Sequence, residues 1–344
     1  MKTALMGLSH SGKRTLFTLL TGRRVPENRK PGECIEGIAR IRDPRVEVLA
    51  RIFEPRKVTY AENNIVLCPD LVEGAPTHAW LDAARRSDLL CIVVRAFESD
   101  HVYHAAGSVD PERDRRLLDA ELILADLEVV LNRLLRIGKE KKAGRATAAQ
   151  INEERVLIKC SEALESNQPL NRLELSDEAR AAIRSLCLVT MRPVLWAYNV
   201  SEGAVAEPQP PGSLAVSCKI EEEIAAIEDP DERGGFLAAL GLEAAGLDRL
   251  NAAAYDAQGL MSFYTTGKDE VRAWTIRKGS RAPQAGGKIH SDIERGFIRV
   301  EIVRYDDIVA TGSERAAKEQ GKLQLKGKDY VLEDGDTCHF LFNV

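Results

Sequence analysis

The stretch Gly7-Leu8-Ser9-His10-Ser11-Gly12-Lys13-Arg14-Thr15 decides the fold of this chain. It follows the apolar residues 4–6, which predict a buried strand, and it precedes residues 16–20, which predict the first turns of a helix. A strand, a loop bracketed by two glycines and a helix make the local structure that a phosphate-binding loop needs. In such a loop the backbone N–H groups converge on phosphate oxygens, and the helix dipole adds positive potential. The alternative is a glycine turn with no ligand.

We call residues 7–15 the phosphate loop, and its sequence satisfies the pattern G-x-x-x-x-G-K-[ST] as far as Lys13. Lys13 would supply a positive charge to the outer phosphates of a nucleotide. The pattern fails at Arg14, which stands where a hydroxyl group would hold Mg²⁺. The predicted phosphate-binding residues are Ser9, His10, Ser11, Gly12, Lys13, Arg14 and Thr15.

The composition is that of a globular protein of two or three domains. Of the 344 residues, 44% are hydrophobic and 29% are charged, so the chain can bury a large core. The net charge of −5 does not by itself indicate a nucleic-acid partner, although basic residues gather at 136–142 and 277–281. The seven cysteines form no C-x-x-C pair, which indicates reduced thiols and no zinc site. With no secretory leader and no apolar run of about 18 residues, we expect a cytoplasmic protein.

Short apolar runs alternate with helical patterns over the first hundred residues. Strands are predicted at 37–41, 64–67 and 89–95, and helices at 43–53 and 79–86. Alternation of strands and helices favours a parallel sheet in an α/β domain.

The pattern changes between residues 110 and 165. Leucines recur there at spacings of seven, three, four and three, which predicts the apolar seam of a long helix. A basic turn at 138–144 separates this helix from a second amphipathic helix at 147–166. We predict an antiparallel coiled-coil arm inserted in the α/β domain, and the alternative is a pair of ordinary covering helices. The predicted seam consists of Leu117, Leu124, Leu127, Leu131 and Leu134.

The sheet resumes with predicted strands at 193–198 and 213–217. Ligands of nucleotide-binding α/β sheets lie at the carboxyl ends of the strands, so the residues that follow these two strands are expected to contact a base. A helical segment at 221–250 follows, with predicted breaks at 229–230 and 234–235. The predicted base-site residues are Asn199, Val200, Glu202, Ser217, Cys218 and Lys219.

From residue 260 onward, short strands alternate with turns, which indicates a compact α+β module of about eighty residues. The strands are predicted at 261–265, 271–276, 296–302, 324–325 and 339–342, and a helix at 314–318. The predicted domains are therefore an α/β domain made of 1–109 and 187–258, a helical insertion at 110–186 and an α+β domain at 259–344.

Several long motifs carry a specific resemblance. In the last domain they are EVRAWTIRKG at 270–279, APQA at 282–285, IHSDIERGFIR at 289–299, GKDY at 327–330 and DGD at 334–336. Earlier in the chain they are GL at 7–8 with GK at 12–13, DPR at 43–45, LVEGA at 71–75, ELILADLE at 121–128 and NVSE at 199–202. The chain resembles the YchF/Obg-like ATPase family over nearly its whole length.

The resemblance implies a P-loop NTPase of the translation-factor type, with a helical arm, a C-terminal ubiquitin-like TGS domain and association with ribosomes. It also implies that Asn199 and Glu202 stand in the base-recognition motif, which is N-x-x-E in this family and N-K-x-D in guanine-binding relatives. An Asp carboxylate accepts two N–H bonds from guanine, and adenine offers no such pair. The resemblance therefore implies ATP, or ATP and GTP, as the nucleotide.

The chain departs from the family at the positions that support Mg²⁺. Arg14 replaces the hydroxyl residue, and Leu67 and Asp70 stand where the family has the Asp and the Gly of a D-x-x-G turn. The glycine-rich segment that follows is shortened to residues 76–78, and no Thr occurs between residues 22 and 41. These changes predict a nucleotide site that is not built around Mg²⁺.

The favoured function is therefore a divergent nucleotide-binding protein, weakly or non-hydrolysing, that is associated with ribosomes. The first alternative is a working ATPase, in which Asp70 holds the metal through water and His10 or His78 lies near the attacking water. The second is an adaptor without nucleotide that binds ribosomal RNA through the arm and the last domain.

Overall fold

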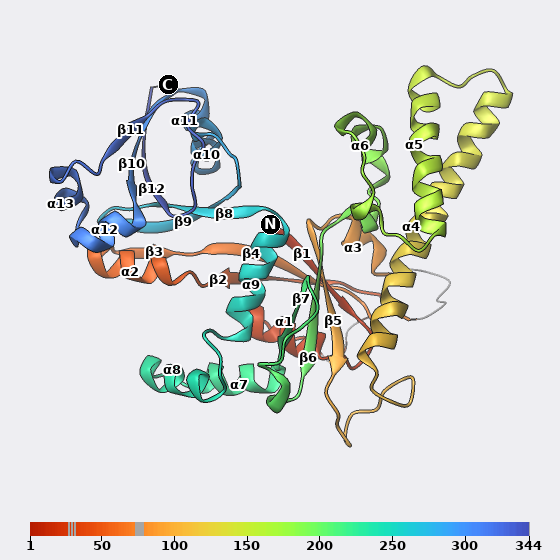
Figure 1. Ribbon diagram of the computed structural model, residues 1–344, viewed down its shortest axis with the longest axis horizontal. Coiled ribbons are helices and arrows are strands. Elements are labelled where there is room, and N and C mark those ends of the chain that lie inside the picture. The colour runs from red at the N-terminus through yellow and green to blue at the C-terminus, as the bar shows by residue number, and fades with distance from the viewer. Residues whose placement is uncertain (27, 29, 31, 73–78, 344) are drawn as a thin grey trace. The chain divides into compact units, whose positions relative to one another are not determined.

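The computed structural model describes the chain apart from residues 27, 29, 31, 73–78 and 344 (Figure 1). The shortened segment at 76–78, His78 and part of the motif at 71–75 therefore lie outside the described residues. Residue contacts divide the chain into two units. The first unit comprises Met1–Ala39 and Asn64–Leu250, and the second comprises Arg40–Asn63 and Asn251–Val344.

The first unit is built around a sheet with the strand order β2-β4-β1-β5-β6-β7 (Figure 1). Strand β1 pairs in parallel with β4 and β5, β5 pairs in parallel with β6, and β6 pairs in parallel with β7. Nearly all residues of β1 and β5 are buried, as expected for a parallel sheet covered on both faces. The predicted parallel α/β sheet is confirmed. Its strands are β1 (Lys2–Gly7), β2 (Ile35–Ile41), β4 (Ala61–Leu67), β5 (Leu89–Ala96), β6 (Val194–Val200) and β7 (Ser213–Val216).

Helices α1 (Lys13–Thr21) and α7 (Cys218–Ala226) follow β1 and β7 and contact each other. The predicted break at 234–235 is wrong, because both glycines lie inside α8 (Pro230–Ala239). A glycine inside a helix costs only about 1 kcal/mol, which the rest of the helix can offset. The break lies at Gly241, whose φ of 70° ends α8 before α9 (Gly246–Ala257) begins.

Two long helices, α4 (Pro111–Lys142) and α5 (Ala148–Glu165), run side by side and form the predicted antiparallel arm (Figure 1). Asp110 caps α4 by accepting the Arg113 N–H, and Thr147 and Gln150 form a capping box at the start of α5. The bidentate ion pair of Arg133 with Glu153 joins the two helices, at 2.7 and 2.8 Å. The short helix α6 (Asp177–Ile183) follows and packs against α5.

The predicted seam of the arm is correct in part, because Leu127 and Leu134 pack against the buried cluster of the arm but Leu124 and Leu131 do not. The side chains buried between α4 and α5 include Ile123, Val130 and Ile137, whereas Leu124 is 56% exposed and Leu131 is 41% exposed. Two neighbouring stripes of α4 repeat every seven residues, and both are apolar. A heptad pattern in α4 alone therefore cannot select the stripe that faces the partner helix.

The second unit holds a sheet with the strand order β11-β10-β12-β8-β9-β3, in which β10 pairs antiparallel with β11 and β12, and β8 pairs antiparallel with β9. The ring of Phe340 packs edge to face against the rings of Phe263 and Phe297 in its core. The five predicted strands and the helix at 314–318 are confirmed. These elements are β8 (Leu260–Thr265), β9 (Glu270–Arg277), β10 (Phe297–Arg304), β11 (Gln324–Lys326), β12 (Asp336–Phe342) and α13 (Glu314–Glu319).

Four further elements of this unit were not predicted from the sequence. They are β3 (Lys57–Thr59), α10 (Ala282–Ile289), α11 (Ser291–Arg295) and α12 (Tyr305–Thr311). Strand β3 pairs in parallel with β9, so residues far apart in the sequence share one sheet. Helix α2 (Pro44–Phe53) also packs on β9. The contacts thus assign residues 40–63 to the second unit, whereas the sequence predicts that all of residues 1–109 belong to the α/β domain. The division into three domains stays a prediction.

Among the described helices, none is both long and apolar enough to cross a bilayer.

Candidate functional site

The phosphate loop has a backbone that only glycine can adopt at two positions. Gly7 has a φ of 149°, and a Cβ on it would overlap the carbonyl oxygen of Val93. Gly12 has a φ of 92°, and a Cβ on it would overlap the side-chain nitrogen of Asn199. Helix α1 begins at the next residue, Lys13. The chain therefore makes a tight turn between the end of the buried strand β1 and the start of α1, and the first amides of α1 lie at the end of that strand.

Lys13 is 2% exposed, and its ammonium group is paired inside the chain. It donates one hydrogen bond to the carbonyl oxygen of Leu8 at 3.0 Å and a short one to the carboxylate of Asp70. The other carboxylate oxygen of Asp70 accepts a hydrogen bond from Ser9 Oγ at 3.1 Å. The guanidinium of Arg14, on the exposed side, lies 3.7 Å from the same oxygen. Asp70 is therefore held by three residues of the phosphate loop.

Two opposing effects set the pKa of Asp70. Burial raises the pKa of this carboxyl, but the charge of Lys13 and the hydrogen bonds from Lys13 and Ser9 lower it further. The net pKa lies below the usual value, so the carboxylate is ionised at neutral pH. The signal for this pair in the sequence is that Asp70 stands where the family that the chain resembles has the glycine of its D-x-x-G turn. The sequence indicates Asp70 as an alternative metal ligand, and its pairing with Lys13 was not predicted.

Ser11 contributes a second polar group to the loop. Its side chain is 1% exposed, and its Oγ has no hydrogen-bond partner among the described residues. A buried hydroxyl without a partner is uncommon in native structures. The hydroxyl, the converging amides and the buried cation are groups that suit phosphate oxygens, so this loop fits a phosphate-bearing ligand.

Asn199 lies at the second-last position of β6 and joins three segments. Its Nδ2 donates to the carbonyl oxygen of Ser11 at 3.1 Å, and its Oδ1 accepts from the N–H of Cys218 at 3.1 Å. The side chain is 5% exposed. Asn199 thus positions the phosphate loop against the start of α7, which brings the predicted phosphate and base residues together.

The other predicted base-site residues divide by exposure. The side chains of Val200, Ser217 and Cys218 are buried, and burial raises the pKa of the Cys218 thiol to about 12. Ser217 caps α7 by accepting the Ile220 N–H. Glu202 and Lys219 are exposed and form a short ion pair with each other. Of the predicted base-site residues, these two carry the exposed charged groups.

The residues at the predicted metal positions do not fit Mg²⁺. This ion prefers several oxygen ligands in octahedral geometry. Leu67 is fully buried at the end of β4, and Arg14 brings a positive charge near the loop. Asp70 supplies carboxylate oxygens, but both already face cations or donors of the loop. Within the described part of the chain, no group of three or more His, Cys, Asp or Glu side chains could hold a metal ion.

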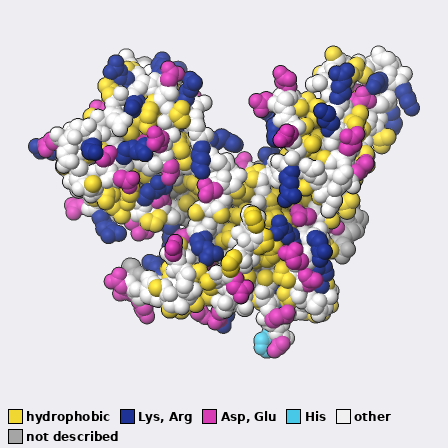
Figure 2. Space-filling model, in the orientation of Figure 1, with side chains coloured by type: hydrophobic (Ala, Val, Ile, Leu, Met, Phe, Trp, Pro, Cys, Tyr) yellow, Lys and Arg dark blue, Asp and Glu magenta, His cyan; other side chains and the backbone are white. Residues whose placement is uncertain are grey.

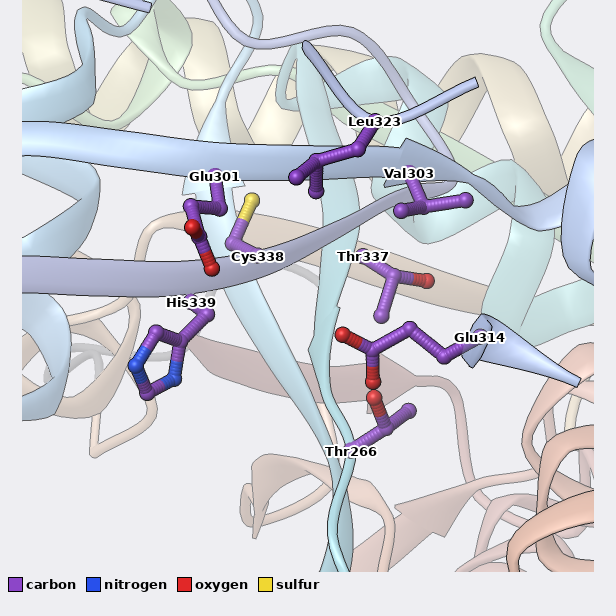
Figure 3. A pocket seen from close by; sticks show the side chains of 8 residues that line it. All are labelled: Thr266, Glu301, Val303, Glu314, Leu323, Thr337, Cys338 and His339. Carbon is purple, nitrogen blue, oxygen red and sulfur yellow. The ribbon is translucent and has the colours of Figure 1, made fainter. Parts of the chain in front are cut away.

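A small pocket lies in the second unit (Figure 3). Its volume of about 40 Å³ has room for a few water molecules and is far below that of a nucleotide site. Lys318 lies 2.9 Å from Glu314 and 4.0 Å from Glu301, so the acidic lining is partly neutralised. The pocket is lined by Thr266, Glu301, Val303, Glu314, Leu323, Thr337, Cys338 and His339.

Comparisons with known proteins agree with the resemblance seen in the sequence. Residues 260–343 match the family model YchF-GTPase_C, described as a protein of unknown function (DUF933). The chain is 38% identical to the ribosome-binding ATPase YchF of Bacillus subtilis (strain 168), over 100% of both chains. It is 37% identical to the ribosome-binding ATPase YchF of Escherichia coli O157:H7, over 100% of this chain and 99% of that one.

The fold agrees as well. The solved structure of the Schizosaccharomyces pombe YchF GTPase superposes with a TM-score of 0.80 and 30% sequence identity, over 99% of this chain and 97% of that one. The predicted fold class is thereby confirmed: a P-loop NTPase α/β domain, an inserted helical arm and a C-terminal α+β domain. Full-length identity above a third and a shared fold along the whole chain lead to one conclusion: this chain belongs to the YchF family.

Proposed function

We propose that this chain binds a nucleotide, ATP or GTP, at the phosphate loop, hydrolyses it weakly or not at all, and acts in association with ribosomes. The observation that supports this most is the pairing of the buried Lys13 with Asp70 in a loop that lacks residues suited to Mg²⁺. The loop keeps the groups that bind phosphate and lacks those that hold the metal.

The phosphate part of the site would consist of the amides of residues 9–15, the Ser11 hydroxyl and the Lys13 ammonium. The base would lie near Glu202 and Lys219, whose exposed charges flank the start of α7. Glu202 stands where guanine-specific proteins have Asp, which favours adenine or a relaxed base preference. Competition between ATP and GTP for one fluorescent analogue measures this preference.

Weak hydrolysis follows from the metal positions. Mg²⁺ normally neutralises the β- and γ-phosphate oxygens during phosphoryl transfer, and this stabilises the transition state by several kcal/mol. Leu67 and Arg14 replace two of its usual supports, and a loss of about 1.4 kcal/mol already slows a reaction tenfold. The guanidinium of Arg14 can attract phosphate, so binding and turnover need not be lost together.

The second candidate is a working ATPase. It is favoured by the identity of 38% with a protein named as a ribosome-binding ATPase over the full length of both chains. In this case Asp70 would leave Lys13 and hold a metal, directly or through water. Clear Mg²⁺-dependent release of phosphate by the wild type is the result that would favour this candidate.

A ribosomal partner is proposed from the names of the relatives and from the charge of the arm. Figure 2 shows dark blue basic side chains gathered at the outer end of the α4–α5 pair. Exposed basic residues cluster there, and such a cluster attracts the phosphates of RNA. A ribosomal partner also places the protein in the cytoplasm. The cluster comprises Arg136, Lys139, Lys141, Lys142 and Arg145.

The first prediction tests the nucleotide site with Lys13→Ala. Because Lys13 supplies the buried charge of the loop, we expect the wild type to bind a fluorescent ATP or ADP analogue and Lys13→Ala to bind at least about tenfold more weakly. Lys322→Ala is the control, since Lys322 is an exposed lysine paired with Asp307 in the second unit. Equal binding by wild type and Lys13→Ala would contradict the proposal.

The same proteins serve for turnover and ribosome association. Release of phosphate is measured with and without Mg²⁺ and ribosomes, and we expect it near the level of buffer alone. Sedimentation with ribosomes through sucrose is measured in parallel, and we expect the wild type and both variants to sediment with them. Protein that stays at the top of the gradient would contradict the ribosomal part of the proposal.

A further inference from the structure

The phosphate loop of this structure already holds an anion of its own. The carboxylate of Asp70 lies on the ammonium of Lys13, accepts a hydrogen bond from Ser9 and has Arg14 at 3.7 Å. In a loop of this pattern the lysine reaches the β- and γ-phosphates, while the backbone amides surround the α- and β-phosphates. Asp70 therefore neutralises the Lys13 ammonium, which the outermost phosphate of a triphosphate would otherwise neutralise.

The backbone on both sides of Asp70 is held in place. Cys68 N–H donates to the carbonyl oxygen of Leu5 at 3.0 Å, and Leu71 N–H donates to the carbonyl oxygen of Gly7 at 3.2 Å. The side chains of Leu67 and Leu71 are buried, and Pro69 limits the backbone between them. Asp70 is consequently part of the wall of the site, because the backbone on both sides of it is bonded to β1.

The charges of the site also favour a shorter phosphate chain. Lys13 and Arg14 contribute two positive charges and Asp70 removes one, so one net positive charge remains for a ligand. A γ-phosphate placed on Lys13 would meet the Asp70 carboxylate, and like charges in a half-buried site repel strongly. A diphosphate bound by the amides of the loop would not need the position that Asp70 occupies.

We propose that Asp70 is an internal substitute for the terminal phosphate and that it makes the loop selective for nucleoside diphosphates over triphosphates. This inference rests on the proposed function, because it names the ligand class of the same site. It also gives Asp70 the opposite role to that of a metal ligand. A metal ligand would raise the affinity for a triphosphate with Mg²⁺, whereas an internal anion lowers it.

The experiment measures the affinities for ADP and ATP, each with and without Mg²⁺, by calorimetric titration of the full chain. The variants are Asp70→Asn, which keeps the shape and removes the charge, and Asp70→Gly, which removes the side chain. Asp269→Asn is the matched control, because Asp269 is an exposed carboxylate in the second unit. A thermal melt of each variant verifies that it is folded.

We expect the wild type to bind ADP about tenfold or more tightly than ATP. A γ-phosphate on Lys13 would lie against the Asp70 carboxylate, and like charges in contact repel by more than a tenfold difference in affinity requires. Asp70→Asn and Asp70→Gly should gain affinity for ATP by a similar factor, with a smaller change for ADP, and Asp269→Asn should behave as the wild type. Detectable ATP binding by the two Asp70 variants, with none by the wild type, would support the same conclusion.

Two results would overturn the inference and leave nucleotide binding intact. One is equal affinity of the wild type for ADP and ATP with no change in Asp70→Asn. The other is a loss of Mg²⁺-dependent ATP binding in Asp70→Asn, which would make Asp70 a metal ligand. Absence of ADP and ATP binding in the wild type and in both Asp70 variants would instead refute the proposed function and, with it, this inference.

Discussion

Lys13 is an almost fully buried cation, and a buried charge is stable only with a partner. Here one partner is the carboxylate of Asp70, which lies 57 residues further along the chain. The ion pair stabilises the ligand-free loop, and any anion that uses Lys13 must compete with Asp70.

The stability that Asp70 contributes depends on pH. Its pKa is lowered in the folded chain by Lys13 and Ser9 despite burial, so the unfolded chain binds its proton at a higher pH than the folded chain does. The contribution is therefore complete above the unfolded pKa of about 3.9 and is lost as the pH falls through the folded pKa. The charged groups that face Asp70 in the described residues are Lys13 and Arg14.

We expect Asp70→Asn to lower the free energy of unfolding by about 2 kcal/mol at pH 7, because Lys13 loses its counter-charge. The difference between wild type and variant should remain constant from pH 8 to about pH 5 and shrink below that. Urea unfolding at a series of pH values measures it. A difference that grows on acidification would show that the pair does not stabilise the loop.

Single side chains also join the elements of the first unit. On α4, Asp126 is fully buried and accepts hydrogen bonds from Val189 N, Thr190 N and Thr190 Oγ1, at 2.6 to 2.9 Å. Burial raises the pKa of this carboxyl although these three bonds oppose the shift. The contact fixes α4 to the segment that leads into β6, and so connects the arm to the strand that carries Asn199.

The packing of the arm itself gives an element-scale prediction. Ile123 is 5% exposed and faces α5, while its neighbour Leu124 is 56% exposed on the side of α4. We expect Ile123→Ala to lower the free energy of unfolding by about 2–4 kcal/mol, because it leaves a cavity. Leu124→Ala should change it by less than about 1 kcal/mol.

Denaturant unfolding of the two variants, which each remove the same number of carbon atoms, makes the comparison. The leucine heptad favoured from the sequence predicts the reverse order. A larger loss of unfolding free energy in Leu124→Ala than in Ile123→Ala would therefore support Leu124 as a seam residue.

At the scale of the molecule, the second unit is assembled from two distant parts of the chain. Arg45 binds the carboxylate of Asp334 at 2.7 Å and that of Asp43 at 3.0 Å. The buried Tyr264 donates its hydroxyl to Asp43, also within this unit. Because β3 also extends the sheet beyond β9, residues 40–63 complete a fold that residues 251–344 begin.

This assembly predicts the behaviour of fragments. A fragment of residues 251–344 lacks β3 and the partners of Tyr264 and Asp334, so its β9 edge and a buried hydroxyl remain unpaired. We expect it to unfold at a lower urea concentration than a single chain in which residues 40–63 are linked to it. Circular dichroism during a urea titration measures both midpoints, and coincident midpoints would contradict the division into these two units.

The sequence by itself predicted most of the elements and a phosphate-binding loop. Two glycines after an apolar run and before a helical pattern dictate a strand, a tight turn and a helix, because their φ angles exclude other residues. Periodicity located the two long helices of the arm, and Asn199, near the end of β6, indicated the base side of the site. These signals are local, since each depends on the conformation or periodicity of neighbouring residues.

Only the tertiary structure decided which distant groups meet. Asp70 could have faced water, a metal or Lys13, and its carboxylate faces Lys13 because Cys68 and Leu71 fix the backbone beside β1. The seam of the arm and the addition of β3 to the second sheet were likewise open, because two apolar stripes or two sheet edges satisfy the same local pattern. Choosing between such equivalent partners requires the packing of the whole chain, which no short stretch of sequence contains.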